Sequence, residues 1–218
     1  MRNMEETKYH DDLNPFTAIW LRPREITRYV IEEKSSGYIW LLIALTGIAA
    51  SLGNMSAPGT GESIPGWGAI ILAIIFGPVA GIIGAAFAAG VFLWIGKLFQ
   101  GTGTYSELFR AVAAAGIPQI WLLPLLFIWM LLSPETFFWQ VGYEPLSGGQ
   151  NIFWMITFLI SAVVGIWGFV IQCLGVAEAH RFSGWKGFFT VLLPLVLFVL
   201  FIILIFILLI GMSGFSSY

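Results

Sequence analysis

Five long stretches without a charged side chain dominate the pattern of polar and apolar positions. They lie between Lys34 and Glu62, between Glu62 and Lys97, between Arg110 and Glu135, between Glu144 and Glu178, and after Lys186. Each stretch holds at least the roughly 20 residues that an α-helix needs to cross a hydrocarbon layer about 30 Å thick. The pattern therefore predicts five membrane-spanning helices, at about 38–56, 68–96, 111–132, 152–176 and 188–211.

The composition supports this reading. The chain is 58% hydrophobic and 10% charged, with a mean hydropathy of +0.89, whereas about a quarter of a soluble domain is charged. We therefore expect an all-α polytopic membrane protein with one membrane domain over 37–212, a disordered cytoplasmic tail at 1–12 and a short external tail at 213–218. Residues 1–12 are polar and acidic, so we expect no cleavable signal peptide, and the first span serves as the signal.

The distribution of basic residues predicts an orientation. Six of the ten Lys and Arg residues precede the first span, Lys97 and Arg110 flank the junction of the second and third, and Arg181 and Lys186 lie between the fourth and fifth. The connections 57–68 and 133–151 and the tail after Gly211 contain none. Because short loops rich in Lys and Arg stay on the cytoplasmic side, we expect a cytoplasmic N-terminus and an external C-terminus.

The segment 13–36 predicts two short amphipathic helices ahead of the first span. Asn14 suits an N-cap and Pro15 the first helical position. A second helix over Pro23–Lys34 would place Ile26, Tyr29 and Val30 on one face. Both are expected to lie in the interface of the cytoplasmic leaflet. The alternative is that they only anchor the start of the first span.

Two features inside the spans bear on packing. Gly77 and Gly81 form a small-xxx-small pair, which allows close helix contact in lipid, either at the centre of the bundle or at a homodimer face. Pro118 and Pro124 interrupt the hydrogen-bond ladder of the third span. Gln119 lies beside the first of them, and broken helices often border the sites of transporters.

No set of residues predicts catalysis or a cofactor. His10 and His180 lie far apart in the sequence, Cys173 is the only cysteine, and the chain has no HExxH, P-loop or GxGxxG motif. These absences disfavour a zinc site, a nucleotide site and a disulfide within the chain. The basic residues are few and form no stripe, so nucleic acid is not an expected partner. We expect a protein that is not an enzyme and binds no metal.

The region before the last span carries the densest polar cluster. Glu178 and Arg181 have the spacing of a local ion pair on a helix, and Lys97, Glu107 and Arg110 are expected on the same side of the membrane. One hypothesis is that Glu178, His180 and Arg181 pair with the 97–110 loop and hold the ends of the spans together. The alternative is a set of ordinary solvated charges. The candidate residues for contacts on the cytoplasmic face are Asn14, Pro15, Arg22, Arg24, Lys97, Glu107, Arg110, Glu178, His180, Arg181 and Lys186.

Three segments together resemble the Yip1 family in its bacterial form. They are NPFTAIWLRPREITR at 14–28, GKLFQGTGTYSELFRAVAAAGIP at 96–118 and GVAEAHRFSGWKGF at 175–188. The resemblance implies a five-helix protein of the bacterial cytoplasmic membrane, with no known catalytic activity and a role through other membrane proteins or lipid. The chain lacks the longer acidic region and the "DLYGP"-like motif of eukaryotic members, so their association with prenylated Rab GTPases is not expected here.

Three functions are compatible with these observations. The first is a membrane scaffold or accessory protein that binds another membrane protein, such as one of a transport system, through 14–28, 97–110 and 175–187. The second is a small-solute transporter or channel, although no charged side chain lies deep in a span, where ion-coupled pumps usually keep one. The third is a lipid-handling or membrane-shaping protein that uses the amphipathic helices at 15–34.

Overall fold

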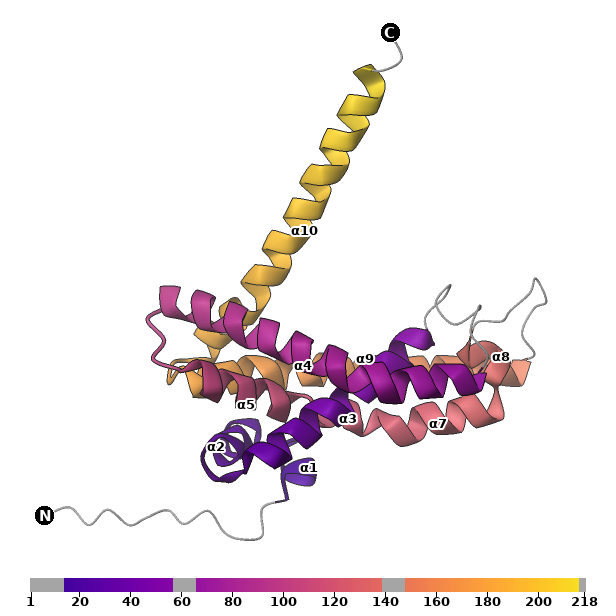
Figure 1. Ribbon diagram of the computed structural model, residues 1–218, viewed down its shortest axis with the longest axis horizontal. Coiled ribbons are helices and arrows are strands. Elements are labelled where there is room, and N and C mark those ends of the chain that lie inside the picture. Colours follow the sequence, from indigo (N-terminus) through magenta and orange to yellow (C-terminus); the bar gives the residue numbers. More distant parts are fainter. Residues whose placement is uncertain (1–13, 57–65, 139–147, 216–218) are drawn as a thin grey trace, which may run out of the picture.

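The computed structural model describes residues 14–56, 66–138 and 148–215, and the regular elements in these ranges are all helices (Figure 1). Five apolar segments are long enough to cross a membrane: Ser36–Met55, Trp67–Leu98, Tyr105–Leu132, Gly148–Ala179 and Gly184–Leu208. The all-α, five-span prediction is thereby confirmed. The tail expected at 1–12 lies outside the described residues, as do the side chains of the tail expected at 213–218.

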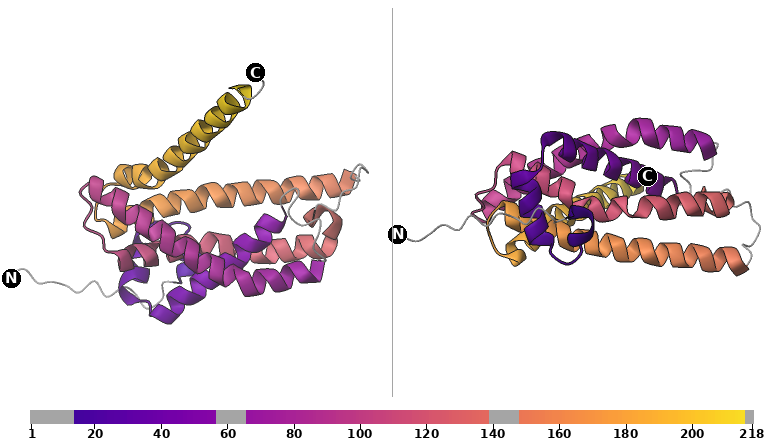
Figure 2. Two further views of the ribbon diagram at one scale, coloured as in Figure 1. Left: turned by 45° about the horizontal axis from the view of Figure 1, so that its top comes forward. Right: turned by 90° about the horizontal axis from the view of Figure 1, so that it is seen from below.

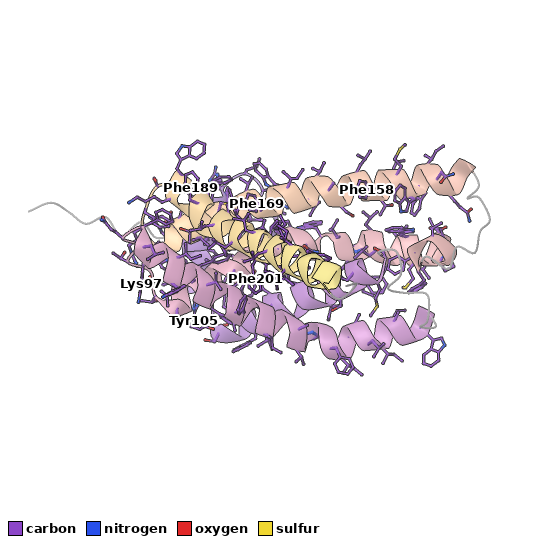
Figure 3. All side chains as sticks on the ribbon, turned by 90° about the horizontal axis from the view of Figure 1, so that it is seen from above. Lys97, Tyr105, Phe158, Phe169, Phe189 and Phe201 are labelled. Atoms are coloured by element: carbon purple, nitrogen blue, oxygen red, sulfur yellow. The ribbon has the colours of Figure 1, made fainter. Side chains whose placement is uncertain are left out.

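The helices in chain order are α1 (Pro15–Ala18), α2 (Pro23–Glu33), α3 (Ser36–Met55), α4 (Gly66–Leu98), α5 (Tyr105–Ala115), α6 (Ile117–Ile120), α7 (Leu122–Leu132), α8 (Pro134–Phe137), α9 (Gly148–Ala179) and α10 (Gly184–Phe215). The third span is thus built from three consecutive pieces, α5 to α7. The second and fourth spans are each one long helix, and α4 and α9 run along opposite sides of the bundle (Figure 3).

The two N-terminal helices start where the sequence predicts. The side chain of Asn14 accepts a hydrogen bond from the Phe16 amide at 3.0 Å, and Pro15 opens α1. Pro23 opens α2, which packs against α5 and α9. Ile26 and Val30 are fully buried there. The apolar face of α2 is therefore covered by protein at one end of the bundle.

Close approach of α3 and α4 depends on three glycines. Gly77 and Gly81 of α4 lie against Gly47 of α3, and a Cβ atom on Gly81 would stand 2.7 Å from the carbonyl oxygen of Ile43. Larger side chains would force the two backbones apart. Small residues supply this contact because lipid gives little hydrophobic drive for helix association. The small-xxx-small pair lies at a contact within the chain.

The prolines of the third span fall at its breaks. α5 ends at Ala115, Pro118 is the second residue of α6, and Pro124 is the third residue of α7. Proline lacks an amide hydrogen and clashes with the carbonyl four residues back, which accounts for the ends of the preceding helices. Gly116, between α5 and α6, is itself packed against Thr46 of α3.

The last helix leaves the bundle. The first turns of α10 pack on α9 and α4, where Val191 is 9% exposed. Beyond Pro194 the helix projects away from the other spans, as two views show (Figures 1 and 2). Its side chains from Leu195 to Leu208 are apolar and almost all exposed. A helix that is apolar on every side suits lipid or another membrane protein.

Candidate functional site

Three segments distant in the sequence meet at one end of the bundle, which we call the basic end: α2, residues 96–110 and residues 178–187. Arg110 Nη1 donates to the Lys34 carbonyl oxygen at 2.6 Å, and Lys186 Nζ donates to the Phe99 carbonyl oxygen at 3.1 Å. Arg24 lies beside Gly184, where an added Cβ would be 3.1 Å from Arg24 Nη2. The basic residues that the structure describes therefore gather on and beside α2, and in or beside the two connections that join α4 to α5 and α9 to α10.

Both of these loops begin with the same helix-ending turn. In a Schellman motif the chain reverses through one left-handed residue, and two amides bond back to carbonyls of the last turn. At the end of α4, Gly101 N donates to Gly96 O at 2.9 Å and the left-handed residue is Gln100, with φ 64°. At the end of α9, Phe182 N donates to Ala177 O at 3.1 Å and the left-handed residue is Arg181, with φ 57°.

His180 joins the two turns. Its carbonyl accepts from the Thr102 amide at 3.2 Å. Its Nδ1 accepts from the Gly103 amide at 3.2 Å, and its Nε2 lies 3.0 Å from the Phe92 carbonyl. Because Nδ1 faces an N–H donor and Nε2 faces an acceptor, the ring fits as the neutral tautomer that carries its proton on Nε2. The side chain is 1% exposed, so the fold holds it away from solvent.

Three glycines make room for this ring. A Cβ atom on Gly96 or Gly101 would overlap the His180 imidazole, and one on Gly103 would stand 2.7 Å from the Ala179 carbonyl oxygen and 3.0 Å from Nδ1. Burial lowers the pKa of His180 below its usual 6.5 and outweighs the opposing effects of the Phe92 carbonyl and Glu107, while the charge of Lys97 adds a smaller effect in the same direction as burial. We call His180 with Gly96, Gly101 and Gly103 the histidine clasp.

Both carboxylate oxygens of Glu107 accept hydrogen bonds. It closes a capping box with Thr104, in which Glu107 Oε2 accepts from the Thr104 amide at 2.7 Å and Thr104 Oγ1 accepts from the Glu107 amide at 3.3 Å. Its other oxygen accepts from Arg181 Nη2 at 2.5 Å. This cap starts the third span at Tyr105, six residues before the predicted start at 111. The T-x-x-E spacing of Thr104 and Glu107 is a readable helix-start signal that the prediction missed.

The expected local pair of Glu178 with Arg181 is not formed, and that prediction was wrong. Arg181 is left-handed and lies beyond the end of α9, so it has lost the helical register that puts positions three apart on one face. Glu178 instead accepts from Arg28 of α2, whose Nε lies 2.7 Å from Oε1 and whose Nη2 contacts the same oxygen. Glu107 thus connects α5 to the turn after α9, and Glu178 connects α9 to α2.

The remaining candidate residues have smaller roles in the geometry. Asn14 and Pro15 form the start of α1, which is tied to the third span by a hydrogen bond from Trp121 Nε1 to the Phe16 carbonyl at 3.0 Å. Arg22 lies 3.7 Å from Glu25 in an exposed pair. Lys97 is exposed at the end of α4, where Figure 3 labels it. Gly77, Gly81, Pro118 and Pro124 lie within the spans, away from these loops.

These contacts determine what the basic end can do chemically. In the part of the chain that the structure describes, no three His, Cys, Asp or Glu side chains cluster closely enough to hold a metal ion. Both nitrogens of His180 are engaged, and Glu107 and Glu178 are bonded to arginines. The ionisable groups therefore fix helix ends, and the arrangement offers a stable surface with exposed cations.

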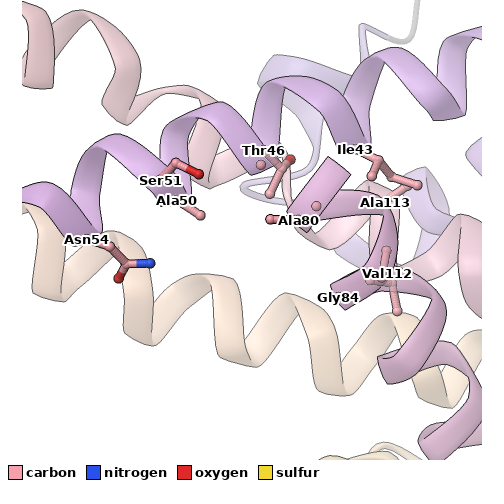
Figure 4. Close-up of a pocket in the computed structure, with 12 residues that line it drawn as sticks. Ile43, Thr46, Ala50, Ser51, Asn54, Ala80, Gly84, Val112 and Ala113 are labelled. Carbon is pink, nitrogen blue, oxygen red and sulfur yellow. The ribbon is translucent and has the colours of Figure 1, made fainter. Parts of the chain in front are cut away.

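A second feature was not found from the sequence. A cavity of about 370 Å³ lies between α3, α4 and α5 (Figure 4), lined by Ile43, Thr46, Gly47, Ala50, Ser51, Asn54, Ala80, Gly81, Gly84, Ala85, Val112 and Ala113. Another of about 270 Å³ is lined by Ala50, Gly53, Asn54, Ser56, Gln119, Leu122, Leu126, Ser161 and Gly165. Of the polar lining residues, only Gln119 was singled out from the sequence. The spacing of Thr46 and Asn54, eight residues apart and so on one face of a helix, was the readable signal of polar side chains on one side of α3.

Comparison with protein families adds one finding. The model of the Yip1 domain matches residues 17–207, which cover the second half of α1, all of α2 and the five spans but for the last residue of the fifth. No curated protein and no solved structure matches the chain.

Proposed function

We propose, on the premise that this chain belongs to the Yip1 family, that it acts as a non-enzymatic scaffold or accessory subunit in the membrane. The basic end would face the cytoplasm and contact another membrane protein. The bacterial cytoplasmic membrane is the proposed location.

The histidine clasp is the observation that carries this proposal. It joins the segments after α4 and α9 through Gly103 and His180, which lie 77 residues apart along the chain. The Arg28–Glu178 and Arg181–Glu107 pairs attach α2 and α5 to the same unit. Surfaces that bind partners without rearrangement need such support, because ordering loops on binding costs free energy. A pre-ordered polar surface at the ends of four helices fits a docking role better than a catalytic one.

The exposed side chains around the clasp fit a partner at the membrane surface. Arg24 and Lys97 provide positive charge, and Trp185 is 74% exposed at the start of α10. Arginine and aromatic residues are enriched at interface centres, and cations steer an acidic partner toward the surface. The expected partner is therefore a membrane protein with acidic side chains close to the headgroup region.

Photocrosslinking in cells tests the proposal. A photoreactive amino acid would replace Arg24 or Lys97 at the basic end, and Leu131 or Trp154 nearer the opposite end as matched controls. We expect one recurrent protein adduct from the first pair, absent from the controls and lost when Lys97→Glu is combined with the probe at position 24. Adducts to lipid alone at every position, or an adduct unchanged by Lys97→Glu, would contradict a docking role of the basic end.

A small-solute path is the second candidate, because cavities lined by Asn54, Gln119 and Ser161 reach into the bundle. Beyond Thr46, the lining of the larger cavity passes to the apolar side chains of Ile43, Val112 and Ala113 toward the basic end. A conducting path would need polar lining along its whole length. Uptake of a polar solute by proteoliposomes, abolished by Gln119→Leu, would favour this candidate over the scaffold.

A further inference from the structure

The two cavities adjoin along one face of α3. Both are lined by Ala50 and Asn54. From Ile43 to Asn54 the combined groove follows 11 residues of α3, and a helix rises 1.5 Å per residue, so this length is about 16 Å. Half of a bilayer's hydrocarbon thickness is about 15 Å. The groove therefore has the length of one leaflet, which is the length of a single lipid chain.

The lining is more apolar toward the basic end and more polar at the other end, with Thr46 and Ser51 between the two. Ile43, Val112 and Ala113 lie toward the basic end. Asn54, Ser56, Gln119 and Ser161 surround the other end. None of the residues lining the two cavities is charged. A ligand with a long apolar chain and an uncharged polar head fits this division, because a buried ionic head would have no opposite charge beside it.

The groove also has an unobstructed side. A Cβ atom on Gly84 of α4, or on Gly165 or Gly168 of α9, would meet no other atom within 4 Å. These glycines belong to the two helices that run on opposite sides of the bundle, with α10 passing over the space between them (Figure 3). A chain within the bilayer could therefore reach Asn54 sideways, between α4 and α9.

We propose that this groove binds one hydrocarbon chain of an amphiphile, with an uncharged hydroxyl, ester or amide head held at Asn54 and Gln119. The chain lies along Ala50, Gly47 and Ile43, and Gly84 borders it from α4. The site is separate from the basic end, so it neither needs nor excludes a protein partner there.

The test uses the full-length protein in nanodiscs and a monoacylglycerol with a photoreactive diazirine in its chain. Labelled peptides are located by mass spectrometry. Gly84→Leu adds a side chain at a residue that lines the groove and where the added Cβ meets no other atom within 4 Å. Gly90→Leu is the matched control, because a Cβ there also meets nothing within 4 Å and the residue lines neither described cavity. Size-exclusion profiles and thermal unfolding of both variants establish that they fold.

We expect labelling of α3 between Ile43 and Asn54, reduced at least five-fold by Gly84→Leu and unchanged by Gly90→Leu. Unlabelled monoacylglycerol and diacylglycerol are separate competitors. Competition by the first alone identifies a free single-chain amphiphile, and competition by both identifies one chain of a bilayer lipid. Labelling spread evenly over α10 and the groove, equal labelling of the two leucine variants, or equal competition by a fatty acid anion or by glycerol would overturn the proposal.

Discussion

Acidification should weaken the histidine clasp. Lowering the pH from about 7.5 to about 5.5 protonates an unfolded histidine, whose pKa is near 6.5. Burial lowers the pKa of His180 in the folded protein. A proton on Nδ1 would also face the Gly103 amide, which is a donor. The folded state therefore binds fewer protons than the unfolded state throughout this interval.

The sign and size of the pH effect on stability follow from this difference in bound protons. Stability due to a group with a lowered folded pKa is fully present above the unfolded pKa, and it falls as the pH drops toward the folded pKa. The slope cannot exceed about 1.36 kcal/mol per pH unit for one proton. Over this interval His180 should therefore reduce the free energy of unfolding by at most about 1.4 kcal/mol.

The measurement is equilibrium unfolding in mixed micelles, followed by tryptophan fluorescence, for the wild type and for His180→Asn. Asparagine can place an oxygen near the position of Nδ1 and keep the bond to the Gly103 amide, but it does not titrate in this range. Subtracting the free energy of unfolding of His180→Asn from that of the wild type removes the contributions of the other titrating groups. A difference that stays constant between the two pH values, or that grows in favour of the wild type on acidification, would refute the assigned burial and tautomer of His180.

Three further predictions concern the same end of the bundle. Gly101→Ala should lower the free energy of unfolding by about 2 kcal/mol, because its Cβ overlaps the His180 ring. The control Gly90→Ala, in open space within α4, should raise the free energy of unfolding by up to about 1 kcal/mol. Equal effects of the two substitutions would contradict the close packing of Gly101 on His180. Gln100→Gly should stabilise by about 1 kcal/mol, because Gln100 is left-handed; thermal unfolding against Gln100→Ala, which keeps the strain, checks this. A double-mutant cycle of Glu107→Gln and Arg181→Gln should give a coupling in the free energy of unfolding of about 0.5–1 kcal/mol, since the pair is partly exposed. A coupling of zero would mean that this ion pair does not stabilise the basic end.

The spans and the starts of α1 and α2 could be predicted because they depend on local sequence. A charge-free stretch of sufficient length is a helix in lipid whatever its neighbours are, since its backbone must bond within itself. Pro15 and Pro23 begin helices by fixing one backbone angle. The early start of the third span at Tyr105 was also local, and the Thr104 capping box would have revealed it.

The pairing of charges was predicted only in part: Arg181 and His180 contact Glu107 and Gly103 of the 97–110 segment, as hypothesised, but Glu178 pairs with Arg28 of α2. The expected Glu178–Arg181 pair assumed that α9 continues past Arg181, and the sequence offers no glycine there to mark the left-handed turn. The true partners, Arg28 and Glu107, come from α2 and α5, which reach Glu178 and Arg181 only through tertiary packing. The cavity beside Thr46 likewise depends on how three glycines bring α3 and α4 together.

The packing is uneven along the bundle, and this relates the two proposed sites. At the basic end the clasp and two ion pairs connect α2, α4, α5 and α9 through directed polar contacts. Toward the other end, the apolar side chains of α9 from Ile152 to Val163 are largely exposed, and Gly165 adjoins open space. Polar contacts permit few alternative arrangements, whereas apolar surfaces in lipid can exchange one neighbour for another at little cost. The basic end therefore fixes how the helices meet, while the helices that border the groove along α3 have apolar surfaces that could shift to fit the proposed hydrocarbon chain.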